Sequence, residues 1–188
     1  MPVRQTNVMR MNQSDEWLAR AAAEGDPAAF STLVERHYDA LFRLCFRLTG
    51  SRAEAEDLTQ DICAALPSKL QGFRGDARVT TWLYRIAVNK AHDLRRRQAS
   101  ADRAAAGWGD AELARRAEAD DSAAWIGWLM AAMARLKEDL RDTLALVLDD
   151  MTHAEAAEIL GVSESTISWR VWEARKRLAA MYATEEQE

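Results

Sequence analysis

Apolar residues recur three and four positions apart along most of the chain, and no stretch alternates apolar with polar residues as a strand would. This spacing predicts four helices in the first half, at residues 15–24, 27–49, 52–70 and 80–97. It fades over residues 99–124, where small and acidic side chains dominate, and resumes from Trp125 to Met181. We therefore predict an all-α protein with two small helical domains joined by a flexible linker.

The predicted domain boundaries follow the points at which the helical pattern starts and stops. A chain of 188 residues, 48% of them apolar, is long enough for two small domains. Within the linker, Gly107 and Gly109 flank Trp108 and interrupt the helical pattern. The predicted segments are a disordered tail at 1–14, a first domain at 15–98, the linker at 99–124, a second domain at 125–182 and an acidic tail at 183–188.

Composition argues against a membrane protein, a secreted protein and an enzyme. Charged residues make up 29% of the chain, and neither an apolar run of about 18 residues nor a signal-peptide core occurs, so we expect a cytoplasmic protein. Cys45 and Cys63 lie at helical spacing among apolar residues and are expected to be reduced thiols in the core. The three histidines are scattered, and we see no metal-ligand cluster, phosphate loop or nucleophile–base pair. We therefore expect no cofactor, metal or catalytic site.

Cationic and aromatic side chains gather between Phe73 and Arg97, although the formal net charge of the chain is −5. Seven Arg and Lys residues stand there against two Asp residues, a local net charge of +5. Rings stack on unpaired bases and guanidinium groups hold phosphates, so this composition indicates a surface for single-stranded nucleic acid. The spacing leaves open that Trp82 and Tyr84 are core aromatics with solvated arginines around them. One side of the predicted helix carries Trp82, Arg85, Asn89, His92 and Arg96.

The preceding helix carries an acidic face. Asp57, Gln60 and Asp61 lie at i, i+3 and i+4, away from the apolar residues Leu58 and Ile62. Spacing alone favours an ordinary solvated helix surface for these three residues.

Residues 152–178 have the pattern of a helix-turn-helix motif. Thr152 and Glu155 form a capping box, Gly161 supplies the turn, and Ser163 caps the following helix. That second helix would enter the major groove of DNA with its N-terminal part. The alternative is a helical hairpin with a solvated basic end. Residues 163–178 carry a net charge of only +2, so phosphate attraction by this domain alone should be weak.

Taken together, these segments resemble a known protein family. Residues 54–97 (EAEDLTQDICAALPSKLQGFRGDARVTTWLYRIAVNKAHDLRRR) resemble conserved region 2 of bacterial RNA polymerase sigma factors of the extracytoplasmic function (ECF) subfamily. Residues 152–178 resemble region 4 of the same factors, and the likeness extends from Asp15 to Met181. It implies a non-catalytic subunit that binds core polymerase and recognises the −35 and −10 promoter elements of a stress or envelope-response regulon.

The resemblance also implies partners and residue roles. Core polymerase would bind through its β′ clamp helices and β flap, with Asp57, Gln60 and Asp61 docking on the clamp helices. The linker would thread the RNA exit path, and a cognate anti-sigma factor, often membrane-anchored in this subfamily, would hold the chain inactive. Residues expected to bind and melt the −10 element are Phe73, Arg74, Arg78, Thr80, Trp82, Arg85, Asn89 and Arg96. Residues expected to bind the −35 element are Ser165, Thr166, Ser168, Trp169, Arg170, Trp172, Arg175 and Lys176.

The sequence departs from the family pattern in the recognition helix. Ser168 and Glu173 stand where relatives commonly carry basic residues, and Trp169 stands where a small serine is usual. The −35 sequence therefore cannot be copied from relatives. Upstream of the motif, the spacing predicts core positions at Trp125, Trp128, Met130 and Met133.

Two other functional classes remain open from sequence alone. A free-standing helix-turn-helix regulator would bind duplex DNA tightly without polymerase, whereas a sigma factor would bind weakly until core polymerase is added. An enzyme would show turnover without polymerase.

Overall fold

The computed structural model of the chain describes residues 13–104 and 121–185. Within these ranges the chain consists of helices and connecting turns, without a strand. The expected tail at 1–14, the linker at 99–124 and the acidic tail at 183–188 lie largely or partly outside the described residues. No helix in the described part of the chain is long and apolar enough to cross a bilayer.

The first domain contains four helices whose starts are set by local capping. Ser14 accepts a hydrogen bond from the N–H of Trp17, and Asp26 accepts from Ala28 and Ala29 ahead of a helix with Pro27 at its first position. Ser51 caps the next helix in the same way. The helices are α2 (Asp15–Ala23), α3 (Pro27–Thr49), α4 (Arg52–Leu70) and α5 (Val79–Ala104).

Three of these four helices end within one residue of the predicted position, and the fourth does not. We predicted that α5 would end near Arg97, but it continues to Ala104. The extra residues contain alanine, arginine and no Gly or Pro, so their helix propensity carries the helix beyond its last core contact.

The core of the first domain forms where α3, α4 and α5 meet. Leu44, Leu48, Ile62 and Leu83 are almost completely buried there. Cys45 lies in the same core, where burial raises the pKa of its thiol to about 11, while Cys63 is only partly buried. Both cysteines are free thiols, and Cys45 is the one that occupies the predicted core position.

The second domain contains the helices α6 (Asp121–Ala134), α7 (Glu138–Val147), α8 (His153–Leu160) and α9 (Glu164–Glu185). Met130 and Met133 are buried, as predicted. The prediction that Trp125 is a core residue is wrong, because 51% of its surface is exposed. Trp125 stacks on the partly buried Trp128 with ring centroids 5.0 Å apart. Both rings make T-shaped contacts with the ring of Tyr182. The three rings form a surface cluster where α6 meets α9.

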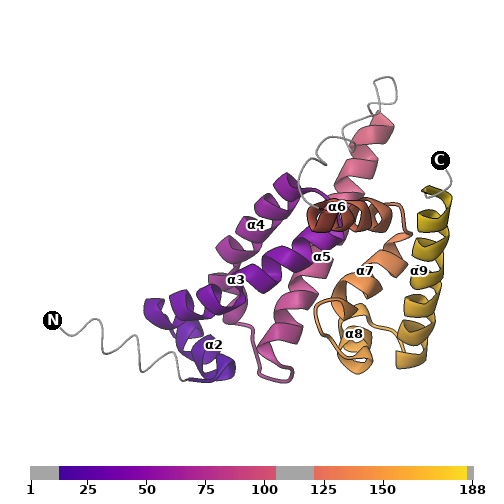
Figure 1. The fold of residues 1–188 in the computed structure, drawn as a ribbon. Coiled ribbons are helices and arrows are strands. Elements are labelled where there is room, and N and C mark those ends of the chain that lie inside the picture. Colours follow the sequence, from indigo (N-terminus) through magenta and orange to yellow (C-terminus); the bar gives the residue numbers. More distant parts are fainter. Residues whose placement is uncertain (1–12, 105–120, 186–188) are drawn as a thin grey trace.

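The two domains pack against each other along one side of α3 and α5 (Figure 1). Helix α3 contacts α6 and α7, and α5 contacts α8. Gly50, which ends α3 with a φ of 74°, lies so close to α6 that an added Cβ would stand 3.2 Å from the Cβ of Ala134. Both a left-handed backbone and close packing therefore favour glycine at this position.

Two buried acidic residues of the second domain anchor this packing. Asp142 on α7 is 2% exposed and accepts hydrogen bonds from His92, at 2.6 Å, and Arg95, at 2.9 Å, on α5. Asp149, just after α7, pairs with Arg47 at 2.7 Å and accepts a hydrogen bond from the hydroxyl of Tyr84. Each carboxylate thus has a charged partner from the first domain, which offsets the cost of burying it.

The contact between His92 and Asp142 predicts a pH dependence. The hydrogen bond that His92 donates to Asp142 raises the pKa of His92 above its ordinary value of 6.5, and Glu138 adds to this while burial and Arg95 oppose it. Because the folded-state pKa is the higher one, this stabilisation is complete below about pH 6.5 and disappears as the pH rises through the folded-state value. We expect the free energy of unfolding to fall by less than about 1 kcal/mol on raising the pH from 6 to 8, since water screens the half-exposed ring.

Urea unfolding at several pH values measures this effect. His92→Gln removes the titrating ring, so the pH-dependent component between pH 6 and 8 should shrink. An identical pH profile for the variant and the original chain would contradict the assignment.

Candidate nucleic-acid interface

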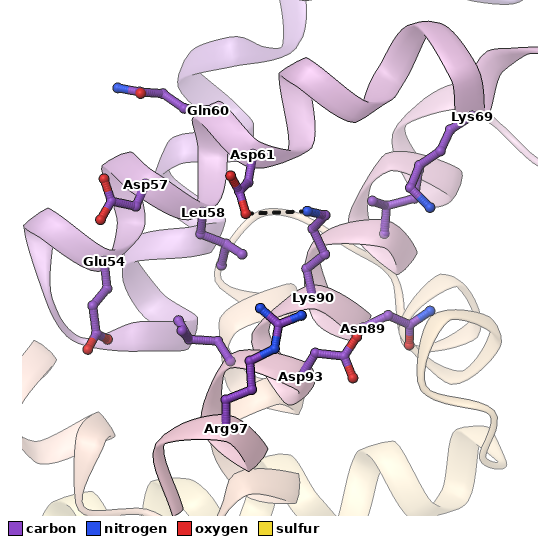
Figure 2. A pocket seen from close by; sticks show the side chains of 12 residues that line it. Glu54, Asp57, Leu58, Gln60, Asp61, Lys69, Asn89, Lys90, Asp93 and Arg97 are labelled. Atoms are coloured by element: carbon purple, nitrogen blue, oxygen red, sulfur yellow. Dashed lines mark ion pairs between the residues drawn. The ribbon is translucent and has the colours of Figure 1, made fainter. Parts of the chain in front are cut away.

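The acidic face of α4 is exposed and forms one wall of a cleft. Asp57, Gln60 and Asp61 are exposed, whereas the adjacent Leu58 and Ile62 are buried. The cleft has a volume of about 650 Å³ and lies between α4 and α5 (Figure 2). The structure therefore brings the three predicted docking residues together on one surface.

The opposite wall of this cleft belongs to α5 and includes Asn89, the residue predicted to contact a base. Asn89 is exposed, and the neighbouring Lys90 reaches across to Asp61 with its Nζ 3.5 Å from Oδ2 (Figure 2). The amide of Asn89 and the acidic face of α4 therefore line the same cleft. The charge of Asp61 is partly balanced from the helix that carries Asn89.

Two aromatic rings pack against each other where the loop after α4 leads into α5. Phe73 and Trp82 are both half-buried, and their ring centroids are 5.2 Å apart with the planes tilted by 58°. Thr80, in the first turn of α5, is partly buried, and Arg74 in the loop is exposed. This tilted ring pair holds Trp82 in one orientation and leaves part of its surface open for contact.

Helix α8 of the second domain forms ion pairs with two of the arginines predicted to bind the −10 element. The guanidinium of Arg78 pairs with Glu155 at 2.9 Å, and that of Arg85 pairs with Glu158 at 2.8 Å. Arg96, farther along α5, pairs with Asp93 of its own helix at 2.9 Å. Two of the predicted −10 arginines are therefore paired with carboxylates of the second domain in this arrangement.

The helix-turn-helix geometry matches the predicted motif in detail. The backbone N–H of Thr152 donates to Glu155 at 3.0 Å, and the N–H of Glu155 donates back to the Thr152 hydroxyl, which completes the capping box. The hydrogen bonds that the N–H and hydroxyl of Thr152 donate to the Glu155 carboxylate, with a smaller contribution from Arg78, lower the pKa of this carboxyl. Gly161 ends α8 with a φ of 66°, the left-handed conformation that the turn requires.

Most predicted −35 residues lie on the exposed side of α9. Trp169 and Trp172 are more than half exposed, and the ammonium of Lys176 lies 5.1 Å from the centre of the Trp172 ring. Ser165, Ser168 and Arg175 are exposed, and Thr166 is partly buried. Arg170 differs, because its side chain is 17% exposed and turned toward Asp139 on α7.

Comparison with known proteins identifies the family. The model of Sigma-70 region 2 matches residues 33–101, and a model of Sigma-70 region 4 matches residues 126–178. The RNA polymerase sigma factor NccH of Alcaligenes xylosoxydans xylosoxydans is 36% identical, the alignment covering 89% of this chain and 94% of NccH. The ECF RNA polymerase sigma factor SigM of Mycobacterium tuberculosis is 35% identical, with coverages of 92% and 86%. The chain belongs to the ECF sigma factors. It is therefore a promoter-specificity subunit of RNA polymerase that initiates transcription and has no catalytic activity of its own, as predicted.

Solved structures agree with the fold of this ECF sigma factor. The structure of CnrH in complex with the cytosolic domain of CnrY aligns with a TM-score of 0.70 at 28% identity, covering 92% of this chain and 99% of CnrH. RpoE of Bartonella quintana, solved with the anti-sigma factor NepR, also aligns with a TM-score of 0.70, covering 82% of this chain and 96% of RpoE at 23% identity. The predicted all-α fold with two sigma domains is confirmed.

Sequence reasoning missed the residues that join the two domains of this sigma factor. Asp142 and Asp149 pair with side chains roughly 50 to 100 positions earlier, so no local spacing could reveal them. The charge distribution did indicate contact between the domains, because residues 73–97 carry a net charge of +5 and residues 125–188 carry a net charge of −5. Two segments of opposite charge in one chain favour mutual contact.

Proposed function

We propose that the first domain, residues 15–98, binds core polymerase through Asp57, Gln60 and Asp61 on the β′ clamp helices. The observation that carries this proposal is the exposure of all three side chains on one wall of the α4–α5 cleft. An exposed carboxylate pair beside a glutamine suits a basic partner surface, since opposite charges guide association and polar side chains fix its geometry. Residues 99–124 then serve as the linker, and residues 125–182 contact the β flap and the −35 element.

We also propose that the same domain holds the unpaired non-template strand of the −10 element. Phe73 and Trp82 supply ring surface at the start of α5, while Asn89 offers an amide that can pair with a base edge. The backbone phosphates are held by Arg74, Arg78, Arg85 and Arg96, and Thr80 contributes from the first turn of α5. Taking a base out of the stack costs a few kcal/mol, which stacking and edge hydrogen bonds repay.

DNA binding then competes with contacts between the two domains. Glu155 and Glu158 form ion pairs with Arg78 and Arg85 in the packed arrangement, so phosphates compete with these carboxylates for the two arginines. In each ion pair at least one of the two side chains is substantially exposed to water. Each pair therefore contributes little stability, and a phosphate can take the place of the carboxylate. This explains why the chain alone should bind promoter DNA weakly and gain affinity only with core polymerase.

We propose in addition that a cognate anti-sigma factor holds this sigma factor inactive in the cytoplasm. Support comes from the related CnrH, whose structure was solved with the cytosolic domain of CnrY. By the same reasoning, the inhibitor of this chain would be membrane-anchored and would report an envelope or stress signal. Purification of the chain from its native host under unstressed conditions should yield a bound inhibitor, and recovery of the chain alone would count against this partner.

The role of Asn89 is open to a direct test. Asn89→Ala should reduce the preference for the best −10 sequence over single-base variants by roughly ten-fold, because one amide pairing with a base edge is lost. Run-off transcription by the reconstituted holoenzyme on matched promoters measures the preference, and core binding should stay unchanged. Gln98→Ala, which removes an amide from the same helix where it contacts Glu54, is the control. An unaltered −10 preference in Asn89→Ala would remove Asn89 from the proposed site.

A further inference from the structure

The N-terminal half of the recognition helix α9 exposes large apolar rings. Trp169 is 55% exposed and Trp172 is 57% exposed, and a separation of three positions puts both on one side of the helix. Exposed tryptophans are uncommon on a solvated helix, and none of the core contacts of the second domain requires these two. The two indoles are therefore the most prominent groups on the side of α9 that faces away from α7 and α8.

The hydroxyl groups between these rings and the helix start are already engaged in local hydrogen bonds. The Ser163 hydroxyl lies 2.8 Å from those of both Ser165 and Thr166. Ser168 donates to the carbonyl of Glu164 at 3.1 Å and lies 3.0 Å from Nδ1 of His153. Hydroxyls engaged in this way are poor donors to base edges, because donating to a base would first break a hydrogen bond within the protein.

The groups that read purines with paired hydrogen bonds are missing from this part of the helix. Guanine is typically read by Arg or Lys and adenine by Asn or Gln. Between Glu164 and Ala174 the sequence has no Lys, Asn or Gln, and its one arginine, Arg170, is turned toward Asp139. Glu164 can only accept hydrogen bonds, which limits it to base amines.

We infer that this sigma factor reads its −35 element chiefly through the C5-methyl groups of thymine, which Trp169 and Trp172 contact in the major groove. The thymine methyl is the one apolar feature that a base pair presents there, and apolar side chains are its natural partners. Lys176 stacks on the Trp172 ring at 5.1 Å, which orients the indole and keeps a cation beside it for the adjacent phosphate. The inference rests on the proposed role of α9 in binding the −35 element.

Replacement of thymine by deoxyuridine tests the inference, because it removes only the methyl group and keeps every hydrogen-bonding group. The −35 element is first selected by run-off transcription with the full chain and core polymerase on promoters randomised in that region. Binding of the holoenzyme to the selected promoter is then measured with each −35 thymine replaced in turn. We expect affinity to fall by about four-fold for each contacted methyl group.

Variants of the two tryptophans complete the test. In Trp169→Ala/Trp172→Ala, both residues being exposed and outside the core, thymine and deoxyuridine promoters should bind equally. Arg175→Ala, a matched change on the same helix, should weaken both promoters alike and preserve the difference between them. Equal affinity of the unmodified holoenzyme for both promoters overturns the thymine inference alone, as does a difference that persists without the tryptophans. Binding that does not depend on the −35 sequence at all overturns the placement of α9 as well.

Discussion

Core RNA polymerase should no longer assemble with the chain when Asp61 is replaced by arginine. The substitution puts a cation at the centre of the proposed docking surface, where a basic partner surface is expected, and also ends the contact with Lys90. Charge reversal at the centre of an interface typically weakens binding on the order of 100-fold or more. Co-migration of the chain with core polymerase in size-exclusion chromatography, together with a binding titration, measures the loss.

Two control variants separate docking from side effects. Glu56→Arg reverses the same charge on α4, but the side chain lies five positions away, about 140° around the helix from Asp61. Lys90→Ala removes the ion pair with Asp61 without adding a cation. Both variants should assemble with core polymerase nearly as well as the original chain. Normal assembly of Asp61→Arg would refute the docking surface.

Replacing Asp142 by alanine should open the packing between the two domains. Asp142 is buried and accepts hydrogen bonds from His92 and Arg95, so its removal leaves the largely buried Arg95 with only the exposed Glu138 as an acidic partner among the described residues. We expect the free energy of unfolding to fall by about 3 kcal/mol, the usual cost of breaking a buried ion pair from one side. Urea unfolding measures this value. Because opening separates Arg78 and Arg85 from Glu155 and Glu158, the free chain should also bind a single-stranded −10 oligonucleotide more tightly.

Asp139→Ala is the matched control for this experiment. It removes an acidic residue from the same helix, but one whose side chain is 45% exposed and whose nearest cation, Arg170, is 3.6 Å away. Its effect on stability should stay below about 1 kcal/mol. Equal effects of Asp139→Ala and Asp142→Ala would show that Asp142 has no special role in joining the domains.

Local features of the fold were predictable because their causes lie close together in the sequence. The capping box of Thr152 and Glu155, the turn at Gly161 and the cap at Ser163 each act within a few residues, and each appears where the sequence predicted it. The end of α5 was not predictable, because nothing in residues 98–104 actively stops a helix. Trp125 was assigned to the core from its apolar spacing, but its ring finds aromatic partners at the surface instead.

The candidate site was predictable in its residues but not in its accessibility. Helical spacing and the resemblance to region 2 together identified Asp57, Gln60 and Asp61, which are exposed on one face. The same reasoning named Arg78 and Arg85 without indicating that Glu155 and Glu158 form ion pairs with them. Such contacts join residues more than 70 positions apart and depend on how the domains pack, which local patterns do not encode.

Run-off transcription by core polymerase, with and without the purified chain, on a library of genomic promoters from the native host is the most direct test of promoter specificity. We predict transcripts that require both components and that start downstream of one shared pair of −35 and −10 elements. Transcription that remains as unspecific with the chain as with core polymerase alone would contradict the account.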